Sequence, residues 1–167
     1  MTPTPGVRAA RAATRFVVQQ HDATTLHYDF RLEVEGVLRS WAVPKGPSMN
    51  PADKRLAIEV EDHSMGWGEF EGRIGAGYGK GAVIVWDRGT YEGLDDVPVA
   101  AALARGRASF RLHGEKLRGG FALVRTRAGA KPQWLLIKRR DEEADGEGPV
   151  GDRPASVVSG RTLEDLR

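Results

Sequence analysis

The residues most able to do chemistry in this sequence are His27, Asp29 and Arg31, which alternate with apolar residues as far as Leu32. Side chains of a β-strand point alternately to opposite faces, so an extended chain places these three together and turns the apolar residues between them toward a core. An imidazole and a carboxylate are metal ligands, and a guanidinium pairs well with phosphate oxygens. A metal beside an arginine is the arrangement that phosphate-ester chemistry needs.

His21 supplies a second imidazole. It follows the apolar run Phe16-Val17-Val18 and precedes a turn-like segment, residues 22–25, so two strands joined by this turn would bring His21 close to His27 and Asp29. Three protein ligands leave open positions for a substrate, as catalytic metal sites require. This donor set suits manganese, zinc or iron. Alternation by itself is typical of any half-exposed antiparallel strand, so the argument for a site depends on His21.

A second polar group follows in Glu61-Asp62-His63, and Trp67 lies four residues after His63. Next to a metal site, His63 becomes a candidate phosphate ligand or general acid. Lys45 and Arg55 are further candidates for contact with the same anion, although each alone is more often an ordinary surface charge.

Strand patterns separated by glycine-rich turns dominate the sequence. They predict a mainly β protein, a compact closed or nearly closed barrel of about eight strands with one or two short helices. The mouth of such a barrel is a natural place for a site built from several strands. Leu56, Ile58 and Val60 share one face of their strand. The expected strands cover residues 15–19, 26–35, 37–43, 55–61, 81–87, 107–113, 120–126 and 134–139, with a helix over 97–104.

Composition and charge bound the remaining possibilities. A chain of 167 residues can bury one core, and the absence of cysteine excludes disulfides and thiolate metal sites. No apolar run approaches the ~20 residues of a membrane span, so no membrane partner is expected. We expect a disordered basic arm over residues 1–14, a barrel domain over 15–140, and an acidic, linker-like tail with a short terminal helix over 141–167. A basic body suits a polyanionic partner.

Several short motifs agree in order and spacing with one known family. They are Gln19–Leu32, Ser40–Ser48, Glu61–His63, Phe70–Gly72 and Val85–Asp87. Across roughly residues 15–140 the chain resembles the 3′-phosphoesterase domain of bacterial and archaeal DNA ligase D. The resemblance implies a manganese-dependent hydrolase that acts on DNA 3′ ends, first as a nuclease that removes a 3′-terminal ribonucleoside. It then acts as a phosphatase that removes the 3′-phosphate and leaves a 3′-OH for ligation in non-homologous end joining.

The resemblance also implies roles for particular residues. His21, His27 and Asp29 match the metal ligands. Arg31 and His63 match catalytic groups that bind the scissile phosphate. Further phosphate contacts are implied for Lys45, Arg55 and Trp67, and Glu61 is implied to orient a basic side chain from behind the site. The family pattern usually has a tyrosine where this chain has Trp67.

The implied partners are DNA 3′ ends, DNA ligase and polymerase modules, and Ku, in the cytoplasm at the nucleoid. Two alternatives have different chemistry. His27 and Asp29 with a later His63 or His113 also fit the iron triad of a β-fold oxygenase. A non-catalytic β-barrel that binds nucleic acid is the other alternative, although it leaves the ligand-type residues unexplained.

Overall fold

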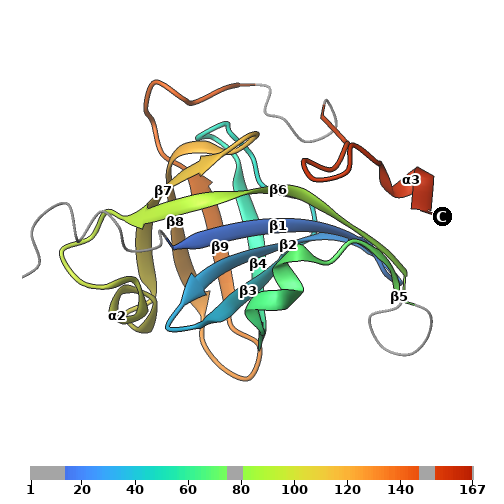
Figure 1. The fold of residues 1–167 in the computed structure, drawn as a ribbon. Coiled ribbons are helices and arrows are strands. Elements are labelled where there is room, and N and C mark those ends of the chain that lie inside the picture. Colours follow the sequence, from blue (N-terminus) through green and yellow to red (C-terminus); the bar gives the residue numbers. More distant parts are fainter. Residues whose placement is uncertain (1–13, 75–80, 147–152, 167) are drawn as a thin grey trace, which may run out of the picture.

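The computed structural model describes residues 14–74, 81–146 and 153–166, so most of the expected basic arm, residues 1–13, lies outside the described residues. The strands form one antiparallel sheet in the order β1-β2-β3-β4-β9-β8-β7-β6-β5, and pairing of β1 with β6 closes eight of them into a barrel (Figure 1). The predicted fold class is therefore confirmed. The elements are β1 (Arg15–Asp22), β2 (Leu26–Val34), β3 (Val37–Val43), β4 (Lys54–His63), the 3-10 helix η1 (Met65–Glu69), β5 (Gly72–Ile74), β6 (Gly81–Gly93), α2 (Val99–Ala104), β7 (Arg107–Gly114), β8 (Arg118–Arg127), β9 (Gln133–Lys138) and α3 (Leu163–Leu166).

The barrel interior is filled by alternate residues of its strands. Tyr28, Phe30 and Leu32 of β2 are buried in the core, as predicted. The ring centre of Phe30 lies 5.9 Å from that of Phe110 and 6.3 Å from that of Trp41. Burial of each such side chain is worth about 1.5–3 kcal/mol. This packing fixes β2 and leaves its other residues on the outer face of the barrel.

The apolar face of strand β4 points away from the barrel interior. Leu56 and the two apolar residues that share its face point away from the core, and Leu56 is 40% exposed, whereas Ala57 is fully buried. On the inward half, the Glu59 carboxylate accepts a hydrogen bond of 2.8 Å from the indole nitrogen of Trp134. A polar group is tolerated there because it is paired. Alternation thus separates the two faces of β4 without showing which one meets the core.

A second apolar layer lies on the outer face of the barrel. Val17, Leu38 and Val85 are buried there, and Met65 of η1 and Val157 of the C-terminal segment pack against them. This layer partly covers the side of the barrel on which the polar half of β2 lies. The polar half of β2 faces outward from the barrel wall, because residues that alternate with core residues point away from the interior.

The described parts of the acidic tail lie against the barrel. Asp141 forms an ion pair of 2.6 Å with the buried Lys138. Residues 153–166 run beside β6 and end in α3 (Figure 1). At the start of α3 the Asp165 carboxylate accepts a hydrogen bond of 2.9 Å from the Thr162 backbone N–H, as in a capping box. Within the described residues, no helix combines the length and apolar character that crossing a bilayer demands.

Asp87 ties β6 to the turn between β7 and β8, and its removal should destabilise the fold. The buried carboxylate accepts hydrogen bonds of 2.8 to 3.2 Å from the backbone N–H groups of Glu115, Lys116 and Leu117. Asp87→Ala leaves these donors without a partner, so we expect the free energy of unfolding in urea to fall by about 3 kcal/mol or more. Asp96→Ala, at an exposed carboxylate, is the control and should cost less than about 0.5 kcal/mol. Equal losses in the two variants would contradict this role.

Candidate metal and phosphate site

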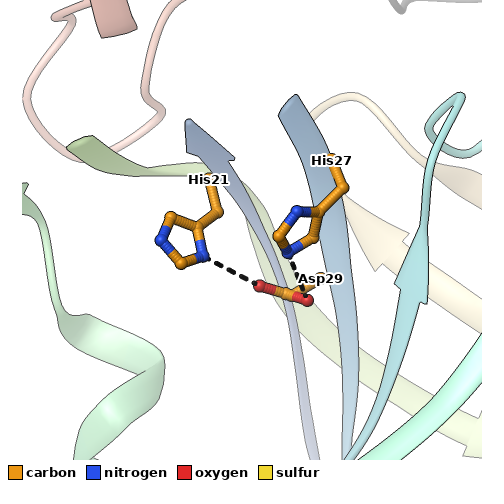
Figure 2. Close-up of side chains that lie close together, drawn as sticks. All are labelled: His21, His27 and Asp29. Atoms are coloured by element: carbon orange, nitrogen blue, oxygen red, sulfur yellow. Dashed lines mark ion pairs between the residues drawn. The ribbon is translucent and has the colours of Figure 1, made fainter. Parts of the chain in front are cut away.

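Antiparallel pairing of β1 with β2 brings the predicted metal ligands together. His21 lies opposite His27, and Gln19 lies opposite Asp29. The His27 Nε2 atom is 3.2 Å from Asp29 Oδ1, and the His21 Nδ1 atom is 3.8 Å from Asp29 Oδ2. Figure 2 shows the two imidazoles approaching the carboxylate from adjacent strands. The turn that follows β1 therefore produces the proximity that the sequence predicted.

The cluster of His21, His27 and Asp29 fits a single metal ion. One donor atom of each side chain lies within 4.8 Å of the donor atoms of the other two. His21 and Asp29 are buried and His27 is half-buried, so the protein shields most of the donor groups from solvent. Two imidazoles and a carboxylate are a donor set shared by manganese, zinc and iron sites. Three protein ligands would leave coordination positions for a substrate.

Asp29 remains charged in spite of its burial. Burial alone raises a carboxyl pKa, but the hydrogen bonds with His21 and His27 and the positive charge of Arg31 outweigh it and hold the pKa of Asp29 well below its usual range. The hydrogen bond to Asp29 in turn raises the pKa of His27, although burial opposes the increase. The cluster thus offers a fixed negative charge to a proton or a metal cation.

Arg31 is 3% exposed and links the cluster to the rest of the site. Its Nε donates to Gln19 Oε1 at 2.7 Å, and its Nη1 donates to Ser40 Oγ at 2.8 Å. Its Nη2 lies 3.4 Å from Asp29 Oδ2, and Nη1 also lies 3.1 Å from His63 Nδ1. Most donors of the guanidinium fork are therefore engaged by the protein. Burial lowers the pKa of Arg31, and the charge of Asp29 opposes that change.

Gln19 and Ser40 were not predicted as site residues. Gln19 lies two residues before His21 on the same face of β1, so the alternation that selected His21 also points to Gln19. Ser40 lies opposite Arg31 in the pairing of β2 with β3. The position of Ser40 in the site depends on the register in which β3 pairs with β2. That register is fixed when the strands pair in the folded sheet.

Strand β4 brings His63 to the other side of Arg31. The His63 Nδ1 atom lies 3.1 Å from Arg31 Nη1 and 3.1 Å from the main-chain oxygen of Glu61. Nδ1 would have to accept a hydrogen bond from Arg31 but donate one to the Glu61 oxygen. A neutral imidazole in one tautomer can therefore make only one of these two hydrogen bonds. Burial, and then the charge of Arg31, lower the pKa of His63 and favour the neutral ring. When Nδ1 accepts from Arg31, the ring proton is on Nε2.

Trp67 of η1 stacks on His63 and on Phe70. The ring centres are 5.8 Å and 4.8 Å apart, with interplanar angles of 30° and 8°. The main-chain oxygens of Trp67 and Phe70 accept hydrogen bonds of 2.9 and 3.1 Å from Gln19 Nε2. Among the described residues the Trp67 Nε1 atom is buried without a hydrogen-bond partner. Trp67 is therefore placed to support His63, and a direct phosphate contact requires the indole to move.

Three other predicted residues lie at the margin of this network. The Glu61 side chain is exposed, and the contact of Glu61 with His63 is made by its main-chain oxygen. Lys45 is exposed beyond the end of β3, and Arg55 forms an ion pair of 3.5 Å with Asp53. In the part of the chain that the structure describes, no hydrogen bond or ion pair joins these three side chains to Arg31. Their contacts with a substrate phosphate remain predictions.

Comparison with known proteins identifies the family. Residues 19–125 match the family described as the DNA Ligase D 3′-phosphoesterase domain, and this range includes His21, His27, Asp29, Arg31 and His63. The multifunctional non-homologous end joining protein LigD of Pseudomonas aeruginosa is 51% identical over 171 residues, which cover 97% of this chain and 20% of that protein.

Two mycobacterial relatives agree with this match. The multifunctional non-homologous end joining DNA repair protein LigD of Mycobacterium tuberculosis is 44% identical over 131 residues, covering 77% of this chain and 16% of that protein. The LigD protein of Mycolicibacterium smegmatis is 40% identical over 135 residues, covering 77% and 17%. This chain thus spans about a fifth or less of the length of these relatives. It belongs to the family of DNA ligase D 3′-phosphoesterase domains.

Proposed function

We propose that this chain is a DNA 3′-end-healing phosphoesterase. It removes a 3′-terminal ribonucleoside from a DNA strand and then hydrolyses the remaining 3′-phosphate, which leaves a 3′-OH for ligation in double-strand break repair. The observation that carries this proposal is a continuous row of groups on the outer face of the barrel. In it the cluster of His21, His27 and Asp29 meets Arg31 at 3.4 Å, and Arg31 meets His63 at 3.1 Å.

His21, His27 and Asp29 are the residues that would hold a metal ion, which we propose to be manganese. Such an ion supplies Lewis-acid polarisation of a phosphoryl oxygen and activation of water. The low pKa of Asp29 suits this role, because the carboxylate is already ionised when the cation arrives.

Arg31 and His63 would act on the phosphate itself. Gln19 and Ser40 hold the Arg31 guanidinium in a fixed orientation, so its charge needs no rearrangement as negative charge develops on the phosphate oxygens. In the tautomer that accepts from Arg31 at Nδ1, His63 would carry its proton on Nε2 and would donate it to a phosphate oxygen or to the leaving oxygen. Lys45 and Arg55 are proposed as further phosphate contacts. A site of this kind recognises the sugar, backbone and terminus of DNA rather than its sequence.

The names of these relatives describe multifunctional proteins of non-homologous end joining. We accordingly propose DNA ligase and polymerase modules and Ku as partners of this chain, with action in the cytoplasm at the nucleoid. The arrangement does not favour the iron-triad alternative with a later histidine. His113 lies on β7, where it contacts Glu92 at 3.2 Å, and the third ligand position beside His27 and Asp29 is taken by His21.

The deciding assay uses a 5′-labelled DNA primer on a template, ending in a single 3′ ribonucleotide. With manganese we expect a product that is first shortened to a 3′-phosphate end and then converted to a 3′-OH end. An all-deoxynucleotide primer with a 3′-OH is the control and should remain intact, and a primer made with a 3′-phosphate isolates the second step. Parallel reactions with zinc or iron identify the metal. Failure to convert either substrate with any of these metals contradicts the proposal.

Trp67 variants test the support of His63. Trp67→Ala should lower the single-turnover rates of both steps by roughly 2- to 10-fold, because an aromatic pair is worth about 0.5–1.5 kcal/mol. Trp67→Phe keeps an aromatic ring that can stack on His63, although it is smaller than the indole, and the N–H that it removes has no partner among the described residues, so its rates should lie closer to those of the wild type than those of Trp67→Ala. Trp67→Tyr restores the usual family residue and should change the ratio of the two steps at an unchanged melting temperature. Unchanged rates in Trp67→Ala, with a large fall in melting temperature, would remove Trp67 from the mechanism.

A further inference from the structure

Strand β6 has a gap along one edge, next to the site. β5 pairs with β6 at residues 81–83 and β7 pairs with it at residues 89–93, so among the described residues the stretch between them has no neighbouring strand on that side. The main-chain groups of Val85 are satisfied there in another way. Its N–H donates to the Glu71 carboxylate at 2.8 Å, and its oxygen accepts from the Val157 N–H at 3.0 Å. Two segments distant in sequence thus replace a strand.

Residues 153–166, here called the C-terminal strap, fill this gap. Trp86 Nε1 donates to the Arg153 oxygen at 2.9 Å, and Lys116 Nζ donates to the Ala155 oxygen at 2.5 Å. Ser156 is 5% exposed, and its hydroxyl donates to the Glu71 oxygen that also accepts from Val85. The strap is therefore attached both to the barrel wall and to the segment that follows η1.

Glu71 connects the strap to the site. It directly follows Phe70, whose main-chain oxygen, like that of Trp67, accepts a hydrogen bond from Gln19. Gln19 also accepts from Arg31, and the Trp67 ring stacks on His63. The segment between η1 and β5 is thus held by Gln19 at Trp67 and Phe70, and by the contacts of the next residue, Glu71.

A pocket of about 350 Å³, open to solvent, lies between η1, the barrel wall and the strap, and Val17, Leu38, Met65, Gly68 and Val157 are among the residues that line it. Next to this pocket the backbone of η1 packs closely, because a Cβ at Gly68 would lie 3.2 Å from Leu38 and 3.3 Å from Val17. The strap therefore forms one wall of a pocket beside η1, and apolar contacts and hydrogen bonds together fix the position of this helix.

We propose that Ser156 and Glu71 form a latch through which the C-terminal strap positions η1, and thereby His63, for hydrolysis. Ser156 and Glu71 are positioning residues, because they reach the site through Trp67 and Gln19. The strap is a working part of the site and not a spacer. Only the kinetic test of this inference, which measures hydrolysis, rests on the proposed function.

The first test measures structure without metal or substrate. The four tryptophans give separate indole signals in proton–nitrogen correlation spectra, and Trp67→Phe identifies that of Trp67. Ser156→Ala and Glu71→Ala should each shift the Trp67 signal and leave those of Trp41 and Trp134 in place. Ser159→Ala is the matched control, since its hydroxyl accepts only from Arg161 within the strap, and it should shift none of the three.

The second test measures hydrolysis of the 3′-phosphate primer with manganese. Ser156→Ala should lower kcat at least about threefold with KM within about twofold, because small displacements of a group that acts in the transition state reduce kcat. The double variant of Ser156 and Glu71 should lose less than the sum of the two single losses, since the two changes remove the same contact between these side chains. Ser159→Ala should match the wild type.

An unmoved Trp67 signal in both single variants overturns the latch, and so do equal shifts of all tryptophan signals. A moved Trp67 signal with unchanged kcat overturns the positioning role. If Ser156→Ala does not fold, Glu71→Ala carries the same two measurements. An inactive wild-type protein contradicts the proposed function, whereas the spectra still decide whether the latch exists.

Discussion

His27→Ala is expected to abolish hydrolysis of both 3′ substrates while the fold survives. His27 is half-buried and contributes one of the three donors that would hold the metal. Metal catalysis is worth several kcal/mol, so the rate should fall by at least about 10³-fold. Asp29→Ala should lose as much activity, but it also removes the ion-pair partner of the buried Arg31 and should lower the melting temperature further. A chelator should abolish the activity of the wild type, and added manganese should restore that activity.

The measurement is the single-turnover rate on each primer, with manganese binding followed by calorimetry and folding followed by thermal melts. His113→Ala is the matched control, because His113 is an exposed histidine on β7 outside the cluster. It should keep wild-type activity and manganese affinity. Full activity of His27→Ala or Asp29→Ala in the presence of chelator would exclude the metal mechanism.

Arg31→Lys is expected to lower kcat by about 10²–10³-fold, the usual cost of losing one preorganised charge donor. Lysine keeps the positive charge, but a single ammonium cannot contact Gln19, Ser40, Asp29 and His63 at the positions that the guanidinium reaches. The loss should therefore appear even though no charge is removed.

Arg39→Lys is the control for this change. Arg39 lies on β3 near the site but forms only loose ion pairs of 3.7 and 3.5 Å with Glu59 and Asp62, and such pairs contribute little. Rates should be measured for both variants under saturating manganese, with thermal melts alongside. Wild-type rates in Arg31→Lys would show that Arg31 acts only as a structural charge.

The sequence by itself determined the polar face of β2 and the proximity of His21 to it. Alternation with period two makes His27, Asp29 and Arg31 neighbours on one face wherever the strand lies, and the turn after β1 brings His21 to the same face. These are local effects of backbone geometry over a few residues, so they can be derived without knowledge of the remaining chain. The family motifs extended this local inference to His63.

Other features were decided only by the tertiary structure, because they depend on how distant segments align. The register of β3 places Ser40 opposite Arg31. Closure of the barrel leaves Leu56 exposed on the outer face and places the site on the outer wall. The composition of the tail predicted a linker, yet Ser156 reaches Glu71 across a gap in β6. Composition and alternation describe each segment alone. An incomplete sheet edge leaves some main-chain N–H and C=O groups without a strand partner. Their identity is fixed only when the whole sheet has formed.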